Sequence, residues 1–191
     1  TPEKWRIALN AVLPNDIVVK FVQTVSPDFH ARHSAIRKRY RYLICNLPYQ
    51  PAFSRKQSWW INQPLDIKRM EQAAQILIGE HDFSAFRAAN CSSPSPLKNI
   101  REILISKKRF RYSTLQIEFE ANSFLQHMVR IITGTLVEVG QGRKNVDDVA
   151  EALESGQRKL AGITAPAHGL YSLNVIYPQG MIKWPKEVID N

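Results

Sequence analysis

Cysteine is scarce in this chain of 191 residues, and long apolar runs are missing. Cys45 and Cys91 lie too far apart in sequence for a C-x-x-C motif, so we expect reduced structural thiols and a cytoplasmic protein. No apolar stretch approaches the roughly 18 residues that a membrane span needs, and the N-terminal residues lack the layout of a signal peptide. The sequence thus predicts neither a membrane protein nor a disulfide-stabilised one.

Motifs for metals and nucleotides are also missing from the sequence. The five histidines have no metal-ligand spacing with cysteine and form no H-E-x-x-H motif. A phosphate-binding loop and a dinucleotide fingerprint are both absent. We therefore expect a protein without a metal site.

Acidic residues are outnumbered by basic ones. The chain has 26 Lys and Arg against 17 Asp and Glu, a net charge of +9. This balance favours an anionic partner but does not separate nucleic acid from an anionic membrane. A hydrophobic content of 44% supports a globular fold with a sizeable core.

The segment from His30 to Ile44 concentrates basic and aromatic residues beside a strand-like run. Alternation places Tyr40 and Tyr42 on one face of a strand, and Arg39 and Arg41 on the other. Rings and cations together suit RNA, a polyanion with stackable bases. The alternative is that these are ordinary half-buried or solvated sheet residues. The candidate RNA-binding residues of this segment are His30, Arg32, Arg37, Lys38, Arg39 and Arg41.

The hydrophobic pattern predicts an α+β protein, with an antiparallel sheet and helices packed on one face, as a single domain over 1–191. A hairpin between 100 and 120 contains a basic turn with Lys107 and Lys108, a second candidate RNA-binding patch. Asp82 is expected to cap a short turn. Helices are predicted over 5–13, from 66 to 79, over 124–139 and over 146–153, with further strands over 17–25, 58–61 and 170–177.

Arg130 is the exception on the predicted 124–139 helix, which is apolar nearly all round. A buried guanidinium needs a carboxylate or phosphate partner to offset its desolvation. Alternatively, Arg130 reaches an edge or pairs with a structural acid. We take Arg130 as a candidate functional residue.

Five motifs, in the order found in the family, resemble tRNA pseudouridine synthase A, and the resemblance covers about 10–178. The resemblance implies the C-terminal lobe of an α+β pseudouridine synthase fold, a homodimer, and isomerisation of uridine to pseudouridine in the anticodon arm of tRNA without a cofactor. The motifs are Asp28-Phe29-His30-Ala31-Arg32, Arg39-Tyr40-Arg41-Tyr42, Gly79-Glu80-His81-Asp82-Phe83, Phe124-Leu125 with His127-Met128-Val129-Arg130, and Gly169-Leu170-Tyr171.

The resemblance also assigns roles to two residues. Tyr40 matches the tyrosine that stacks on the extruded uracil, and Arg130 matches the arginine that pairs with the catalytic aspartate. The family's nucleophile lies in an Arg-Thr-Asp-x-Gly-Val motif that this sequence lacks. We therefore expect a C-terminal portion without the first lobe, inactive alone. A non-catalytic RNA-binding module and a dimerisation domain are the two alternatives.

Overall fold

The computed structural model describes residues 1–110 and 112–184, with the side chains of 109–113 outside the description. The chain divides into two compact units. Unit 1 contains Thr1–Ala35 and the chain from Tyr177 onward, and unit 2 contains Ile36–Ile176. The single domain over 1–191 stays a prediction, and each unit is described by itself.

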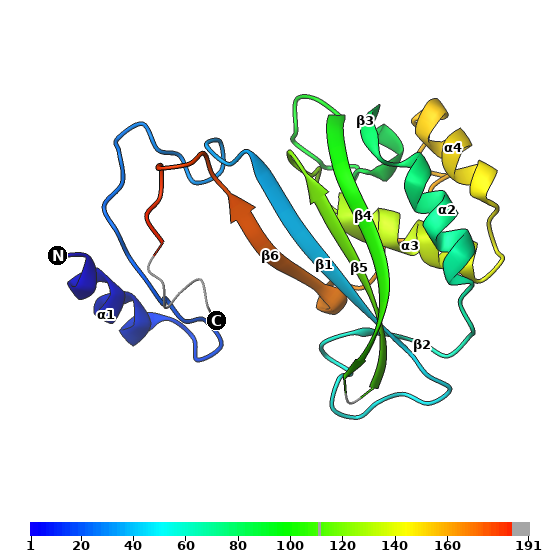
Figure 1. Cartoon of the computed structure of the whole chain (residues 1–191), viewed down its shortest axis with the longest axis horizontal. Coiled ribbons are helices and arrows are strands. Elements are labelled where there is room, and N and C mark those ends of the chain that lie inside the picture. Colours follow the sequence, from blue (N-terminus) through cyan, green and yellow to red (C-terminus); the bar gives the residue numbers. More distant parts are fainter. Residues whose placement is uncertain (111, 185–191) are drawn as a thin grey trace. The chain divides into compact units, whose positions relative to one another are not determined.

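Unit 2 has the predicted α+β architecture (Figure 1). The described residues form a six-stranded sheet in the order β2-β1-β5-β4-β3, and β6 also pairs with β1. The pairs are antiparallel except β1 with β2, which is parallel, so the sheet is mixed. The strands are β1 (Arg37–Asn46), β2 (Trp59–Ile61), β3 (Gly79–Asp82), β4 (Leu97–Phe110), β5 (Tyr112–Ala121) and β6 (Leu170–Ile176).

Three helices pack on one face of this sheet (Figure 1). They are α2 (Ile67–Ile76), α3 (Met128–Gly140) and α4 (Val146–Ser155), with short 3₁₀ turns η1 (Ser84–Phe86) and η2 (Ala167–Gly169) between elements. Helix α3 is buried on almost every side, as its all-round apolar sequence predicts. The core lies between α3 and the inward-facing side chains of β1 and β5, among them Ile44, Ile117 and Phe119.

Aspartate carboxylates accept hydrogen bonds at the start of two elements where the sequence predicts. The Asp66 carboxylate accepts a hydrogen bond from the backbone N of Arg69 at 3.1 Å and starts α2. Asp82 accepts from the backbone N of Ser84, the first residue of η1, at 2.7 Å, which agrees with its predicted turn role although Phe83 occupies the N-cap position.

Two predicted elements are wrong. The 17–25 segment forms no strand in the described chain; the Asn10 side chain instead bonds the backbone N and O of Val19 at 2.8 and 2.9 Å, in place of a strand partner. Lys107 and Lys108 are not in a turn, because β4 continues through them and pairs them with Leu115 and Thr114 of β5. The hairpin extends further because its two strands keep pairing beyond the basic residues.

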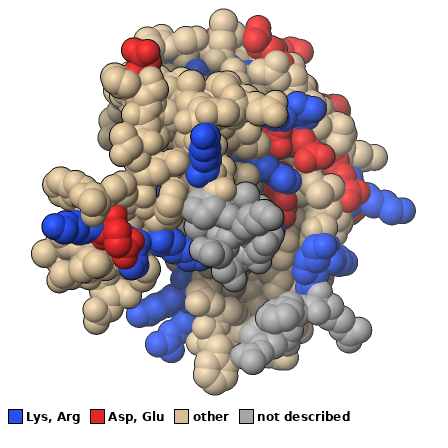
Figure 2. Space-filling view, turned by 60° about the vertical axis from the view of Figure 1, so that its left-hand side comes forward, with Lys and Arg blue, Asp and Glu red and all other residues tan. Residues whose placement is uncertain are grey.

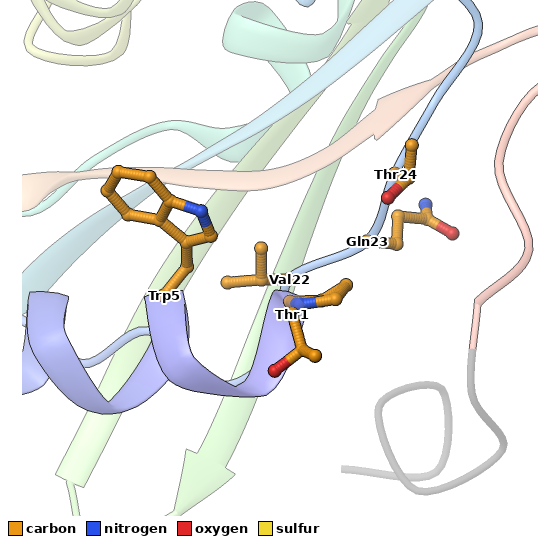
Figure 3. Close-up of a pocket in the computed structure, with 6 residues that line it drawn as sticks. Thr1, Trp5, Val22, Gln23 and Thr24 are labelled. Carbon is orange, nitrogen blue, oxygen red and sulfur yellow. The ribbon is translucent and has the colours of Figure 1, made fainter.

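Unit 1 contains the helix α1 (Pro2–Val12), and none of its residues is buried. Trp5 is 65% exposed. It stands at a surface hollow of about 330 Å³, where Figure 3 shows its indole. The hollow is lined by Thr1, Pro2, Trp5, Val22, Gln23 and Thr24.

None of the helices in the described part of the chain is long and apolar enough to cross a membrane.

Candidate active site

Strand β1 divides its side chains between the two faces of the sheet, as the two-residue period predicts. Tyr42 and Ile44 point into the core and are fully buried. Tyr40 and Lys38 share that face by alternation and are half-buried. Arg39 and Arg41 point to the opposite face. The predicted separation of rings from cations is therefore confirmed from Arg39 to Tyr42, whereas Lys38 adds a cation to the face of Tyr40.

The Tyr40 ring is held at its edge and remains partly open. It meets the Phe124 ring at a centroid distance of 5.2 Å and an interplanar angle of 90°. Phe124 comes from the loop between β5 and α3, and Asn122 fixes the start of this loop by accepting from the backbone N of Ser123 at 2.7 Å. The site thus offers a flat ring in a fixed orientation.

The same loop ends in a strained residue. His127 has φ of +61°, in the left-handed region that residues other than glycine rarely occupy. The chain turns sharply there, so α3 begins at Met128 and not at Phe124 as predicted. The consequence is that Arg130 is the third residue of the helix, close to its N-terminus.

The segment between α4 and β6, residues 156–169, is called the strap here, and it holds Arg130 through both its side chain and its backbone. Arg130 donates from Nε to the Ala165 carbonyl at 2.7 Å, and the Ala165 N–H donates to the Arg130 carbonyl at 3.1 Å. The strap lies close to α3 because glycine stands at the contact. A Cβ on Gly134 would fall 1.9 Å from the carbonyl oxygen of Ile163.

Arg130 has no carboxylate partner among residues 1–110 and 112–184. It is half-buried, and its side chain donates a hydrogen bond to a backbone carbonyl. A cation in the first turn of a helix also opposes the positive end of the helix dipole. Desolvation and dipole both disfavour an unpaired guanidinium here, so the position suits an anionic partner.

Tyr42 anchors the next residue of the strap. Its hydroxyl donates to the Pro166 carbonyl at 2.6 Å. Burial raises the pKa of this phenol well above its usual range, and the charge of Arg130 opposes part of the rise. A Cβ on Gly169 would meet the Tyr42 ring at 2.7 Å, which explains why glycine precedes Leu170 in this motif.

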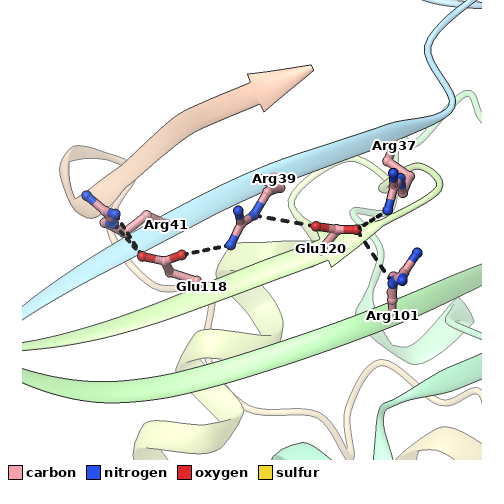
Figure 4. A network of polar contacts seen from close by, with 6 residues as sticks. All are labelled: Arg37, Arg39, Arg41, Arg101, Glu118 and Glu120. Carbon is pink, nitrogen blue, oxygen red and sulfur yellow. Dashed lines mark hydrogen bonds and ion pairs between the residues drawn. The ribbon is translucent and has the colours of Figure 1, made fainter. Parts of the chain in front are cut away.

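On the opposite face, the predicted RNA-binding arginines of β1 lie in a row with two glutamates of β5 (Figure 4). Glu118 pairs with Arg41 at 2.7 Å and with Arg39 at 3.2 Å. Glu120 lies 3.0 Å from Arg37, 3.5 Å from Arg39 and 3.9 Å from Arg101. We call these six residues the Arg–Glu ladder.

The Arg–Glu ladder supports the alternative in which its arginines are sheet residues. The side chains of Glu118 and Glu120 are 16% and 12% exposed, so the arginines compensate carboxylates that the sheet partly buries. Basic and acidic side chains are also interspersed on the face seen in Figure 2. RNA contact by Arg37, Arg39 and Arg41 stays a prediction.

The other predicted RNA-binding residues come from several elements of the two units. Lys38 shares the face of Tyr40, whereas Lys107 and Lys108 are exposed at the far end of β4. His30 and Arg32 are exposed in unit 1. There the His30 ring Nδ1 accepts from the backbone N of Arg32 at 3.1 Å, and the ring lies 4.3 Å from that of His33.

Sequence reasoning missed the residues that hold the site together. Tyr42, Ala165 and Pro166 carry no catalytic signature, because two of them act through backbone carbonyls. Tyr42 was visible as an inward-facing ring, but its bond to a strap over 120 residues later depends on tertiary packing. The pairing of Glu118 and Glu120 with arginines followed from no local pattern, although their alternation in β5 did place them on one face.

Among the described residues, no group of three or more His, Cys, Asp or Glu is placed to hold a metal ion.

Known proteins resemble this chain in sequence. The family model described as tRNA pseudouridine synthase matches residues 73–178. A protein named tRNA pseudouridine synthase A from Hydrogenovibrio crunogenus is 44% identical over 190 residues, which are 99% of this chain and 71% of the relative. A protein of the same name from Thermoanaerobacter sp. is 48% identical over 175 residues, 92% of this chain and 70% of the relative.

Replacing Tyr42 tests the anchor of the strap. The pKa of Tyr42 is raised in the folded chain, whereas the unfolded phenol ionises near pH 10. Its contribution to stability is therefore complete below about pH 10 and is lost progressively as the pH rises towards the pKa of the folded phenol. Tyr42→Phe should lower the free energy of unfolding by about 1 kcal/mol at neutral pH. In this variant the free energy of unfolding should also fall less between neutral pH and about pH 11. Urea unfolding at both pH values measures this. Exposed Tyr49→Phe is the control, and equal pH dependence in both variants would contradict the assignment.

Replacing Glu118 tests what the Arg–Glu ladder does. Glu118→Gln should lower the free energy of unfolding by about 1 kcal/mol, because two half-buried arginines lose their carboxylate. Its RNA affinity should change no more than that of Glu102→Gln, which removes the same charge from an exposed position of β4. Stronger RNA binding by Glu118→Gln than by Glu102→Gln would instead make these arginines phosphate contacts.

Proposed function

This chain belongs to the tRNA pseudouridine synthase family, and we propose that it uses Tyr40 and Arg130 to isomerise uridine to pseudouridine in tRNA. The observation that carries the proposal is the state of Arg130. It is half-buried, fixed at both ends by Ala165, and has no carboxylate partner among the described residues. An arginine held in this way is prepared for an anion that the described residues do not supply.

The reaction rearranges the uridine without adding or removing atoms. The bond from C1′ to N1 breaks, the uracil turns, and a bond from C1′ to C5 forms, while C5 loses a proton and N1 gains one. The base has to leave the RNA stack before an enzyme reaches these atoms. The half-open Tyr40 ring, oriented by Phe124, supports the extruded uracil during this rotation.

Arg130 positions the carboxylate that acts as nucleophile or charge stabiliser. The bond from its Nε to Ala165 fixes the plane of the guanidinium. No hydrogen bond from a described residue engages the two terminal nitrogens, so they are available for a bidentate contact with a carboxylate. By the family resemblance this carboxylate is the aspartate of the Arg-Thr-Asp-x-Gly-Val motif.

The RNA contacts are proposed on position and charge. Lys38 lies on the same face of β1 as Tyr40 and has no ion pair within the described chain, so it is suited to a phosphate next to the flipped nucleotide. We also propose phosphate contacts for His30, Arg32, Lys107 and Lys108. The ion pairs of Arg37, Arg39 and Arg41 favour the sheet role for these three.

The finer parts of the proposal rest on the family resemblance. They are action on the anticodon arm, a homodimer, and catalysis without a cofactor. A dimer in light scattering without RNA would support the second of these. A cytoplasmic location is also proposed, because Cys45 and Cys91 suit a reducing compartment.

Substitutions at Tyr40 test the stacking role in a longer chain that carries the aspartate motif upstream. Tyr40→Ala should lower the rate of pseudouridine formation by about 10-fold or more, because the extruded base loses its stacking partner. Tyr40→Phe keeps the ring and should retain more activity than Tyr40→Ala. The rate is followed in an unmodified tRNA transcript, with melting temperature as the folding control. Full activity in Tyr40→Ala would exclude stacking.

A further inference from the structure

The loop between β1 and β2, residues 47–58, holds two aromatic side chains in solvent. Phe53 is 86% exposed and Tyr49 is 65% exposed. A single exposed aromatic residue is common, but two within five positions indicate a use, because each ring leaves apolar area in water.

The loop is fixed by its own hydrogen bonds. The Ser54 carbonyl accepts from the backbone N of Gln57 at 2.9 Å and from that of Ser58 at 3.0 Å. The Tyr171 hydroxyl of β6 donates to the Gln57 carbonyl at 2.7 Å, and Pro51 is buried. The hydrogen bonds begin at Ser54, one residue after Phe53, and Pro51 is two residues before it. An ordered backbone therefore displays the exposed ring.

Cations are close to these rings in the sequence, and acids are missing there. The sequence has no Asp or Glu between 47 and 58, where Arg55 and Lys56 are exposed. It also has none between 103 and 117. Lys108 lies in the same row of the sheet as Cys45, because both pair with Thr114 of β5. Loop 47–58 leaves β1 immediately after this row, so the loop and Lys107 and Lys108 lie at one end of the sheet (Figure 1).

We propose that loop 47–58 and Lys108, which lies on the face of the sheet that carries Cys45, form a second RNA-binding surface, which stacks unpaired bases on Phe53 and Tyr49. Exposed rings among uncompensated cations match single-stranded nucleic acid, whose bases stack and whose phosphates attract positive charge. The choice of RNA rests on the proposed function. Along β1, Cys45 is five residues from Tyr40, roughly 17 Å, so this surface is separate from the candidate active site.

The first experiment measures binding of a fluorescently labelled single-stranded RNA oligonucleotide by anisotropy. Phe53→Ala should weaken binding about 10-fold, whereas Phe53→Tyr keeps the ring and should bind as the unmodified chain does. Phe53→Leu keeps apolar area without an aromatic face and should bind as weakly as Phe53→Ala. The matched control is Trp5→Ala on α1. Trp5 is 65% exposed, as Tyr49 is, and RNA binding by this variant should stay within twofold of the unmodified chain.

The second experiment measures the salt dependence of the same binding. Lys108→Ala should reduce the slope of log Kd against log salt concentration by about 0.7, the value for one phosphate contact on a single strand. Lys68→Ala removes the same charge from an exposed position elsewhere in unit 2 and should leave the slope unchanged.

Several results would overturn the inference. Phe53→Ala within twofold of the unmodified chain excludes stacking, and Phe53→Leu that binds normally shows that any apolar side chain suffices. Self-association that disappears in Phe53→Ala while RNA binding stays would make the loop a protein contact. Two outcomes separate this inference from the proposed function. If only the second RNA-binding surface is wrong, pseudouridine formation still depends on Tyr40. If only the proposed function is wrong, pseudouridine formation is absent although Phe53 affects RNA binding.

Discussion

The two-residue period of β1 is the constraint on which the rest of the structure depends. This strand pairs with β2, β5 and β6, so its alternation decides what each face of the sheet carries. A shift by one residue would exchange Tyr40 with Arg39 and bury cations under α3. Tyr42 and Ile44 fix the register because they are fully buried, and Tyr40 is carried to the site as a consequence.

Arg130 is placed by backbone groups rather than by a side-chain partner. The strained His127 starts α3 late, and the strap residue Ala165 holds Arg130 through two reciprocal hydrogen bonds. Burial and the helix dipole both disfavour this cation, so holding Arg130 at this position lowers the stability of the fold. Such a cost is expected where a group waits for an anionic partner.

Local patterns predicted the fold class, the inward face of β1 and the special status of Arg130. They failed where tertiary contacts decide. The 17–25 segment reads as a strand, but Asn10 occupies the backbone groups of Val19. The acids that pair with the ladder arginines lie about 80 residues away in β5, so no local pattern in β1 shows this pairing, and RNA contact by these arginines stays a prediction. The bond from Tyr42 to Pro166 spans 124 positions and is invisible to any window of sequence.

The most direct test is tritium release from uridine labelled at C5 in an unmodified tRNA transcript. It compares this chain with a longer chain that carries the Arg-Thr-Asp-x-Gly-Val motif upstream. The account predicts release by the longer chain alone, because Arg130 lacks a carboxylate partner among the described residues. Release by the 191-residue chain would show that one of its own acids is the nucleophile, and would contradict the role given to Arg130.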